Sequence, residues 1–318
     1  MSTANSPDPA NLPPLALIAG PTASGKSDVA VRLAMAHKAR GRECVVINAD
    51  SAQVYADLAV LSARPTAEEM QGIEHRLFGE WDGAAACSAA DWAARASAVI
   101  AETHASGAVP ILVGGTGLYL NTLLAGIAPV PPIDPDVRTE VRALPIAEAY
   151  LALQSEDPDR AAQLSRNDKA RVARALEVIR STERPMADWQ RERRGGIGHL
   201  IDLHAVVLLP ARDWLYARCD RRFGQMLERG AVAEVERLLS RKLDPDLPVM
   251  RAIGVPEITA LLAGDCTREE AAARGAQATR NYAKRQYTWF RNQPPSVWQR
   301  IESHDYNIDS LFASLLRD

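Results

Sequence analysis

A glycine-rich loop that ends in a lysine and a serine is the stretch of this sequence best suited to chemistry. It comprises Gly20, Pro21, Thr22, Ala23, Ser24, Gly25, Lys26 and Ser27, and it fits the pattern G-x-x-x-x-G-K-S. In such a loop, backbone N–H groups and the start of the next helix surround phosphate oxygens. Lys26 adds a positive charge, and the Ser27 hydroxyl is placed to hold Mg²⁺. The loop therefore predicts a site for phosphate groups and a magnesium ion.

The flanks of this loop favour a true phosphate-binding loop over a chance match in a glycine-containing turn. The apolar run 15–19 before it predicts a buried strand, and Val29, Leu33 and Met35 after it follow helical spacing among alanines. Strand, loop and helix are the context that this motif requires.

Two more polar residues follow predicted buried strands, at 43–48 and 109–113. Asp50 comes after the first strand and Thr116 after the second. The carboxyl ends of parallel strands face the ligand in such folds, so Asp50 is expected near the phosphate site. Asp50 is interpreted as a base, as a Mg²⁺-linked carboxylate, or as the cap of a turn. The Thr116 hydroxyl either takes part in the site or only stabilises a tight turn. Because no strand ends in the Asp of an ATPase, the site suits phosphate binding better than ATP hydrolysis.

The elements that must position these residues form an α/β pattern interrupted once. Residues 13–125 and 200–318 predict a P-loop NTPase-like core with a parallel sheet, and residues 126–199 predict a helical insertion domain. The insertion begins in a proline-rich stretch and is expected to hold helices at 136–144, 146–154, 158–164 and 167–181. Within the core, residues 60–80 are expected to be loop-like, and residues 212–240 are expected to be helical.

Two basic stretches are compatible with a polyanionic partner, although most such stretches are merely solvated helix faces. Between residues 166 and 194 there are nine Lys and Arg against five Asp and Glu, and residues 274–291 hold five basic residues and no acidic one. Arg280 and Lys284 share a face of the second stretch, with Tyr282, Tyr287 and Trp289 interleaved. Basic and aromatic side chains together suit contacts to a nucleic-acid backbone and stacking on bases, and a basic helix with aromatics in the core is the alternative.

Composition narrows the class of protein further. The chain has 318 residues, 47% of them hydrophobic, and a net charge of −3, so nucleic-acid contact must come from local patches. Its four cysteines are far apart, which indicates a reducing compartment without disulfides or a cysteine-bound metal. No apolar run is long enough for a membrane span. Residues 1–12 predict a disordered tail and not a signal peptide. We expect a cytoplasmic monomer.

Several separated motifs together resemble the tRNA dimethylallyltransferase family, also called tRNA isopentenyltransferases. The resemblance spans roughly residues 15 to 291. It rests on Gly20–Ser27, Asp50-Ser-Ala-Gln-Val-Tyr55, Ser62–Pro65, His75–Leu77, Ser88–Asp91, Leu112-Val-Gly-Gly-Thr-Gly-Leu-Tyr119, Asn167-Asp168 with Arg174–Glu177, and Thr279-Arg280 with Lys284–Gln286 and Thr288-Trp289. Three departures are Ser27 where Thr is common, Leu61-Ser62-Ala63 in place of an Ile-Gly-Thr-Ala type, and Val255-Pro256 where Tyr is common. The last leaves one local tRNA contact unassigned.

The resemblance implies transfer of the prenyl group of dimethylallyl diphosphate to N6 of adenosine 37, next to the tRNA anticodon. The glycine-rich loop would then hold the donor's diphosphate with Mg²⁺, Asp50 would take the proton of the adenine amine, and Thr116 would bond near the reacting centre. The family pattern also places residues in contact with tRNA. These are Asp50, Ser51, Ala52, Gln53, Thr116, Arg138, Arg171, Arg174, Arg251, Arg280, Lys284 and Arg285.

Three other functions remain as alternatives. A prenyltransferase for free adenine nucleotide would need neither the helical insertion nor the basic C-terminal helix. A P-loop small-molecule kinase would consume ATP and would need a phosphoacceptor site. A non-catalytic tRNA-binding protein would not need Lys26, Ser27 and Asp50 to be intact.

Overall fold

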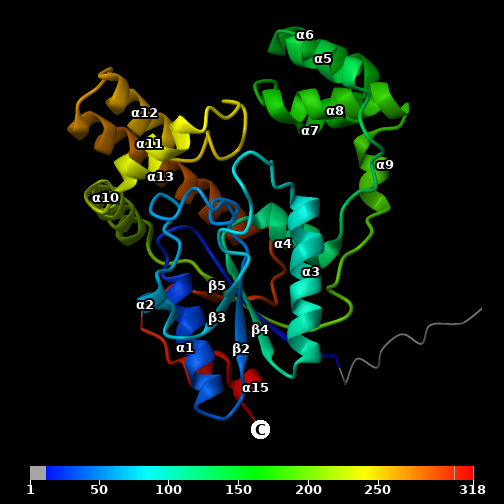
Figure 1. Ribbon diagram of the computed structural model, residues 1–318. Helices are drawn as coiled ribbons and strands as arrows, with labels where there is room; N and C mark the ends of the chain where they lie inside the picture. Colours follow the sequence, from blue (N-terminus) through cyan, green and yellow to red (C-terminus); the bar gives the residue numbers. More distant parts are fainter. Residues whose placement is uncertain (1–11, 304, 318) are drawn as a thin grey trace, which may run out of the picture. The chain divides into compact units, whose positions relative to one another are not determined.

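A six-stranded parallel sheet organises the computed structural model, which describes residues 12–303 and 305–317 (Figure 1). The strands are β1 (Pro14–Ala19), β2 (Cys44–Asn48), β3 (Glu74–Arg76), β4 (Val109–Gly114), β5 (Asp202–Leu208) and β6 (Gln299–Ile301). Their order is β3-β2-β4-β1-β5-β6, and every neighbouring pair is parallel. The predicted α/β fold with a parallel sheet is confirmed. The predicted tail lies outside the described residues, except for Leu12.

The central strands are buried on both faces, which explains their continuous apolar sequence. Ala16 and Ile18 of β1 pack with Val29 and Leu33 of α1 (Lys26–Lys38) in the larger core cluster. On the other face of the sheet lies α3 (Ala89–Ala105), which begins at a Ser88 capping box (Figure 1). The sheet is thus the middle of three layers and gives the loops at its carboxyl edge a rigid base.

The remaining helices of the first unit lie between the strands and after the last one in the sequence. They are α2 (Ala67–Met70), α4 (Gly117–Ala125), α10 (Arg212–Glu228), α11 (Ala231–Ser240), α12 (Val255–Ala263), α13 (Arg268–Asn292), α14 (Ile308–Leu311) and α15 (Ala313–Leu316). The first unit comprises Met1–Leu123 and Gly198–Asp318. The second unit comprises Leu124–Ile197, against the predicted insertion at 126–199.

One prediction about local structure is wrong and another needs one more detail. Residues 60–80 are not only loop, because they contain α2 and the strand β3, which pairs with β2 through Val45, Val46 and Ile47. The charged residues of β3 hide its strand character, since it is a short strand at the edge of the sheet. Residues 212–240 are helical as predicted. They form two helices, because Gly230 adopts a left-handed conformation (φ 100°) between them.

The second unit is helical and has its own core. Its helices are α5 (Pro135–Ala143), α6 (Ile146–Glu156), α7 (Pro158–Gln163), α8 (Lys169–Thr182) and α9 (Met186–Arg191). Val172 and Leu176 of α8 pack with Leu153 of α6 at the centre of this core. The two ends of the unit meet, because Ile127 and Arg194 exchange two backbone hydrogen bonds of 3.0 Å.

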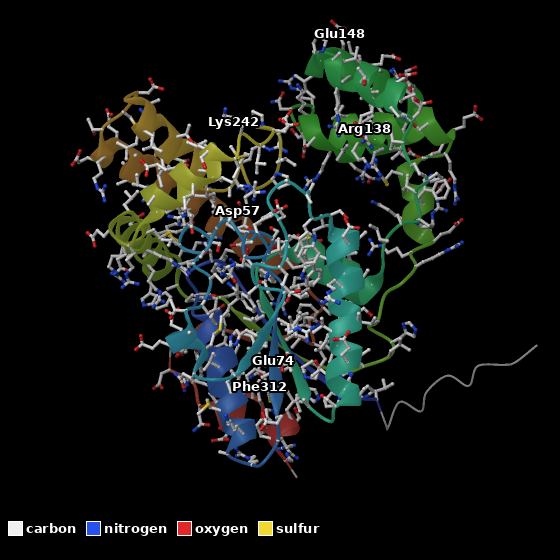
Figure 2. All side chains as sticks on the ribbon, viewed as in Figure 1. Asp57, Glu74, Arg138, Glu148, Lys242 and Phe312 are labelled. Carbon is white, nitrogen blue, oxygen red and sulfur yellow. The ribbon has the colours of Figure 1, made fainter. Side chains whose placement is uncertain are left out.

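The loops after the strands gather at one end of the first unit. Asp57, on the loop after β2, and Phe312, in the C-terminal segment, lie toward opposite ends of the sheet (Figure 2). Among the described residues, no helix is long and apolar enough to cross a membrane.

Candidate functional site

The glycine-rich loop connects β1 to α1 and is shaped by its two terminal glycines. Gly20 has φ 149°, and a Cβ there would lie 2.5 Å from the backbone oxygen of Leu208 in β5. Gly25, with φ 95°, is the left-handed residue that precedes α1. The Lys26 ammonium donates a 2.7 Å hydrogen bond to the Pro21 carbonyl, and Ser27 is exposed in the first turn of the helix. The loop thus presents N–H groups, a cation and a hydroxyl to one side.

Asp50 sits on a turn that the buried side chain of Asn48 holds. The Asn48 amide oxygen accepts from the backbone N–H of Asp50 at 2.8 Å, and its nitrogen donates to the Asp50 and Leu77 carbonyls, both at 3.0 Å. One carboxylate oxygen of Asp50 accepts from the backbone N–H of Ala52 at 3.0 Å. The predicted turn-capping role is therefore present. Asp50 also lines both of the cavities described below.

Thr116 is joined to the same turn. Its hydroxyl oxygen accepts a 2.9 Å hydrogen bond from the backbone N–H of Ser51 and lies 3.2 Å from the Ser51 hydroxyl. The hydroxyl of Tyr282 on α13 bonds to both of these side chains, and burial together with the nearby Asp50 carboxylate raises its pKa. Ser51 and Tyr282 line a cavity beside Asp50. Thr116 thus fixes the turn that carries Asp50, and its assignment as a reacting-centre residue stays a prediction.

A cavity of about 950 Å³, here called the phosphate-side cavity, opens beside the glycine-rich loop. Lys26 and Ser27 line it together with Asp50 and Gln53. Five arginines also line it: Arg64, Arg218, Arg221, Arg222 and Arg229. Such a concentration of cations next to the N-terminus of a helix favours a multiply charged anion.

A second cavity of about 330 Å³, here called the aromatic cavity, is less polar. Tyr55, Tyr119, Phe223 and Tyr282 contribute aromatic rings to its lining, with further apolar atoms from the loop after β2. Tyr119 is held by stacking on the buried Trp92, with ring centroids 4.4 Å apart. A pocket of this kind suits a planar heterocycle and an apolar group.

The two cavities share part of their lining. Thr22, Asp50, Ser62, Ala63 and Arg222 belong to both. Two ligands, one in each cavity, would therefore meet beside the Asp50 carboxylate. The Arg222 guanidinium lies on the same border. This arrangement allows a group held by its phosphates in one cavity to react with a ring held in the other.

Electrostatics on the phosphate side depend on the desolvation of Lys26. Burial lowers the pKa of Lys26 to about 8, while the negative charge of Asp50 opposes this change and the positive charge of Arg222 adds to it. An anion bound beside Lys26 would restore a full positive charge to the site.

The other predicted tRNA-contacting side chains are distributed over both units. Ala52 lines the aromatic cavity with Arg251 and Arg285, whereas Lys284 is exposed on α13. Arg280 is paired with Asp220. In the second unit, Arg138 is exposed on α5, and Arg171 and Arg174 on α8 pair with Asp168 at 3.1 Å and Glu177 at 3.7 Å. Gln53 uses its amide nitrogen to bond the carbonyls of Ser62 and Ala63.

Three residues that shape the site have no role assigned from the sequence, although Gln286 belongs to a motif that carries the family resemblance. Arg222 stands on the border of both cavities, and Gln286 on α13 bonds to the glycine-rich loop. Glu234 is a buried carboxylate that bonds to the loop after β2. The signal for Arg222 was the spacing of Arg218, Arg222 and Arg229 on one helix face, and Glu234 was an acid at an inward position of an amphipathic helix.

No group of three or more His, Cys, Asp or Glu side chains suited to a metal occurs in the described part of the chain. A magnesium ion needs no such group when substrate phosphates supply most of its ligands. The exposed Ser27 hydroxyl lines the phosphate-side cavity with Asp50, so these residues fit a cation that arrives with a diphosphate.

Comparisons with known proteins show which family the chain resembles. A sequence profile described as IPP transferase matches residues 53–293. The tRNA dimethylallyltransferase of Erythrobacter litoralis is 65% identical over 305 residues, covering 96% of each chain, and that of Sphingopyxis alaskensis is 61% identical, covering 96% of this chain and 98% of the relative.

Solved structures are similar as well. The tRNA isopentenylpyrophosphate transferase of Bacillus halodurans has a TM-score of 0.66 and 35% identity, covering 95% of this chain and 94% of its own. A eukaryotic dimethylallyltransferase acting on tRNA has a TM-score of 0.71 and 28% identity, covering 87% of this chain and 70% of its own.

Proposed function

The chain belongs to the IPP transferase family, and from this we propose that it transfers a dimethylallyl group from dimethylallyl diphosphate to N6 of adenosine 37 in tRNA, releasing diphosphate. The observation that carries this proposal is the border between the two cavities. Asp50 and Arg222 line both the cationic cavity beside the glycine-rich loop and the aromatic cavity. A diphosphate-linked donor and an adenine can therefore approach each other there.

The donor's diphosphate occupies the phosphate-side cavity. Backbone N–H groups of the glycine-rich loop, the Lys26 ammonium and the Arg222 guanidinium surround its oxygens. As the bond between the prenyl carbon and the diphosphate oxygen breaks, negative charge grows on the leaving group. These donors are already in place and lower the barrier to departure.

The adenine occupies the aromatic cavity, with its exocyclic amine toward Asp50. This amine is a weak nucleophile because its lone pair is delocalised into the ring. As N6 bonds to the prenyl carbon, one N6 proton passes to a carboxylate oxygen of Asp50, which acts as a general base. The Asn48 and Thr116 bonds keep the turn that carries Asp50 in place during this transfer.

Magnesium is part of the proposal as a partner of the donor's diphosphate. Ser27 would hold it through its hydroxyl, with phosphate oxygens as its other ligands. When bound, the ion neutralises charge on the departing diphosphate.

The tRNA contacts the mouth of the aromatic cavity. Arg251 and Arg285 line that cavity, and Lys284 lies one residue from Arg285 on α13, so phosphates of the anticodon loop have cations to bind there. The target base must leave its stack to enter. On the second unit, Arg138, Arg171 and Arg174 are offered as further contacts. Because both cavities lie within one unit of one chain, we propose that a monomer suffices.

One assay tests the function against its alternatives. The protein is incubated with Mg²⁺, radiolabelled dimethylallyl diphosphate and either unmodified tRNA or AMP. Label in tRNA at N6 of adenosine 37 supports the proposal. Label in AMP would instead indicate a prenyltransferase for free nucleotide. ATP turnover without label transfer would indicate a kinase, and tRNA binding without transfer would indicate a non-catalytic protein.

A further inference from the structure

Glu234 on α11 is a buried carboxylate that serves a distant loop. Its side chain is 3% exposed. One carboxylate oxygen accepts from the backbone N–H groups of Ala59 at 2.6 Å and Val60 at 2.9 Å, and the other accepts from Leu61 at 2.9 Å. No ion pair of Glu234 with Lys or Arg is found in the part of the chain that the structure describes. The three N–H groups therefore compensate the cost of burying its charge.

The loop that Glu234 binds, residues 58–63, is here called the junction loop. All six of its residues line a cavity: Ala59 and Val60 the phosphate-side cavity, Leu58 and Leu61 the aromatic cavity, and Ser62 and Ala63 both. The junction loop thus forms one wall of the border at which the two cavities meet.

The junction loop is held from three directions. Glu234 binds its N–H groups, and the Gln53 amide nitrogen donates to the carbonyls of Ser62 and Ala63, both at 3.0 Å. The Arg222 guanidinium donates to the Ala63 carbonyl at 3.4 Å. The junction loop belongs to no helix or strand. Side chains therefore satisfy backbone groups of the loop that regular secondary structure would otherwise pair. A shift of the loop would carry Ala63 with it and change the position of Arg222.

We propose that Glu234 is a positioning residue of the transfer reaction. It holds the junction loop so that the border between the cavities keeps its width and Arg222 stays beside the donor's diphosphate. Glu234 contacts neither substrate and acts through the loop alone. This inference rests on the proposed function, since it assigns a donor to the phosphate-side cavity and an adenine to the aromatic cavity.

The test uses Glu234→Gln, which keeps the size of the side chain but directs an amide N–H₂ at one of the loop N–H groups. We expect kcat/KM for dimethylallyl diphosphate to fall at least about tenfold, mainly through a higher KM, while KM for tRNA changes less than about twofold. Hydrogen exchange at the amides of residues 59–61 should become faster. Glu234→Asp retains the charge and should give a smaller defect. It also serves as the informative variant if Glu234→Gln does not fold.

Glu177→Gln is the matched control, because Glu177 is a carboxylate of similar burial, 2% exposed, that pairs with Arg142 and Arg174 in the second unit. It should lower thermal stability without changing KM for the donor. A merely structural Glu234 would lower the active fraction and leave both KM values unchanged, and that result would overturn the inference. Unchanged exchange at residues 59–61 would overturn it too. If the wild-type protein transfers no label to tRNA, the proposed function fails first, so the two failures are distinguishable.

Discussion

Gln286 on α13 binds the backbone of Thr22 in the glycine-rich loop, 264 residues earlier in the sequence. Its amide oxygen accepts from the Thr22 N–H at 2.7 Å, and its amide nitrogen donates to the Gly115 carbonyl at 2.8 Å. One buried side chain thus joins the phosphate-binding loop to the loop after β4. A Cβ on Gly115 would lie 2.4 Å from the Gln286 nitrogen, so only glycine leaves room for this contact.

Replacing Gln286 should loosen the glycine-rich loop. We expect Gln286→Ala to cost about 1–3 kcal/mol of stability, because it leaves two backbone groups unpaired, and to raise KM for the prenyl donor. Thermal unfolding and steady-state kinetics measure both effects. Gln277→Ala, an exposed position on the same helix, is the control. An unaltered donor KM in Gln286→Ala would show that the loop keeps its shape without this bond.

Asp50→Asn should separate binding from chemistry. The amide has nearly the same shape but cannot take a proton from N6, so transfer should fall by a factor on the order of 10² or more, with tRNA affinity nearly unchanged. Single-turnover label transfer and tRNA binding give the two quantities. Asp28→Asn removes another carboxylate from the lining of the phosphate-side cavity and should keep most activity. Near-wild-type transfer by Asp50→Asn would remove Asp50 from the mechanism.

Donor binding should weaken as pH rises through about 8. Free Lys26 has a pKa of about 8 and loses its charge above it, whereas bound diphosphate favours the charged form and raises that pKa. Binding above pH 8 therefore takes up a proton, and affinity should drop by up to about tenfold per pH unit. Lys26→Arg keeps its charge, so its affinity for the donor should change little between pH 7 and 10. Titration calorimetry with dimethylallyl diphosphate measures this affinity. If donor affinity fell equally with pH in the wild type and in Lys26→Arg, another titrating group would cause the pH dependence.

His37 should contribute to acid denaturation. It is fully buried on α1, neither ring nitrogen has a hydrogen-bond partner, and burial lowers its pKa from 6.5 to about 4. The unfolded chain therefore binds the proton more strongly. Above pH 6.5 His37 is neutral in both states and does not lower the free energy of unfolding. As pH falls from 6.5 toward 4, protonation of the unfolded chain lowers that free energy by about 3 kcal/mol in total. Denaturant unfolding of His37→Leu should show a shallower pH dependence in this window. The exposed His199→Leu should not differ from wild type.

Lys284 and Arg285 should control the salt dependence of tRNA binding. Each is an exposed cation on α13, and each phosphate contact that is removed should reduce the slope of log K against log salt by about 1. Binding of Lys284→Gln and Arg285→Gln is measured from low to moderate salt. Arg280→Gln is the comparison, because Arg280 is already paired with Asp220 and should change the slope less. A slope that none of these variants changes would make the helix purely structural.

The sequence predicts the parts of this site that depend on neighbouring residues. The glycine-rich loop and the turn at Asp50 follow from buried strands and local motifs, because parallel strands bring their carboxyl ends together. The contacts of Gln286, Glu234 and Arg222 could not be predicted in the same way. Each acts on backbone groups more than 150 residues away, and in the sequence each is one polar residue on an amphipathic helix. The strand β3 was missed because its pairing with β2 overrides the weak strand propensity of its charged residues.

The paired backbone bonds between Ile127 and Arg194 close the neck through which the chain leaves the sheet-based unit and returns. Gly126 makes this closure possible, since its φ is 83° and a Cβ there would lie 2.5 Å from the Arg194 oxygen. The segments by which the chain enters and leaves the helical unit are thus joined by backbone hydrogen bonds at one place. We expect that changes in length among the helices between these two residues leave the connections to the sheet-based unit in place. The two cavities would be unaffected by such changes, because all the residues that line them belong to the sheet-based unit.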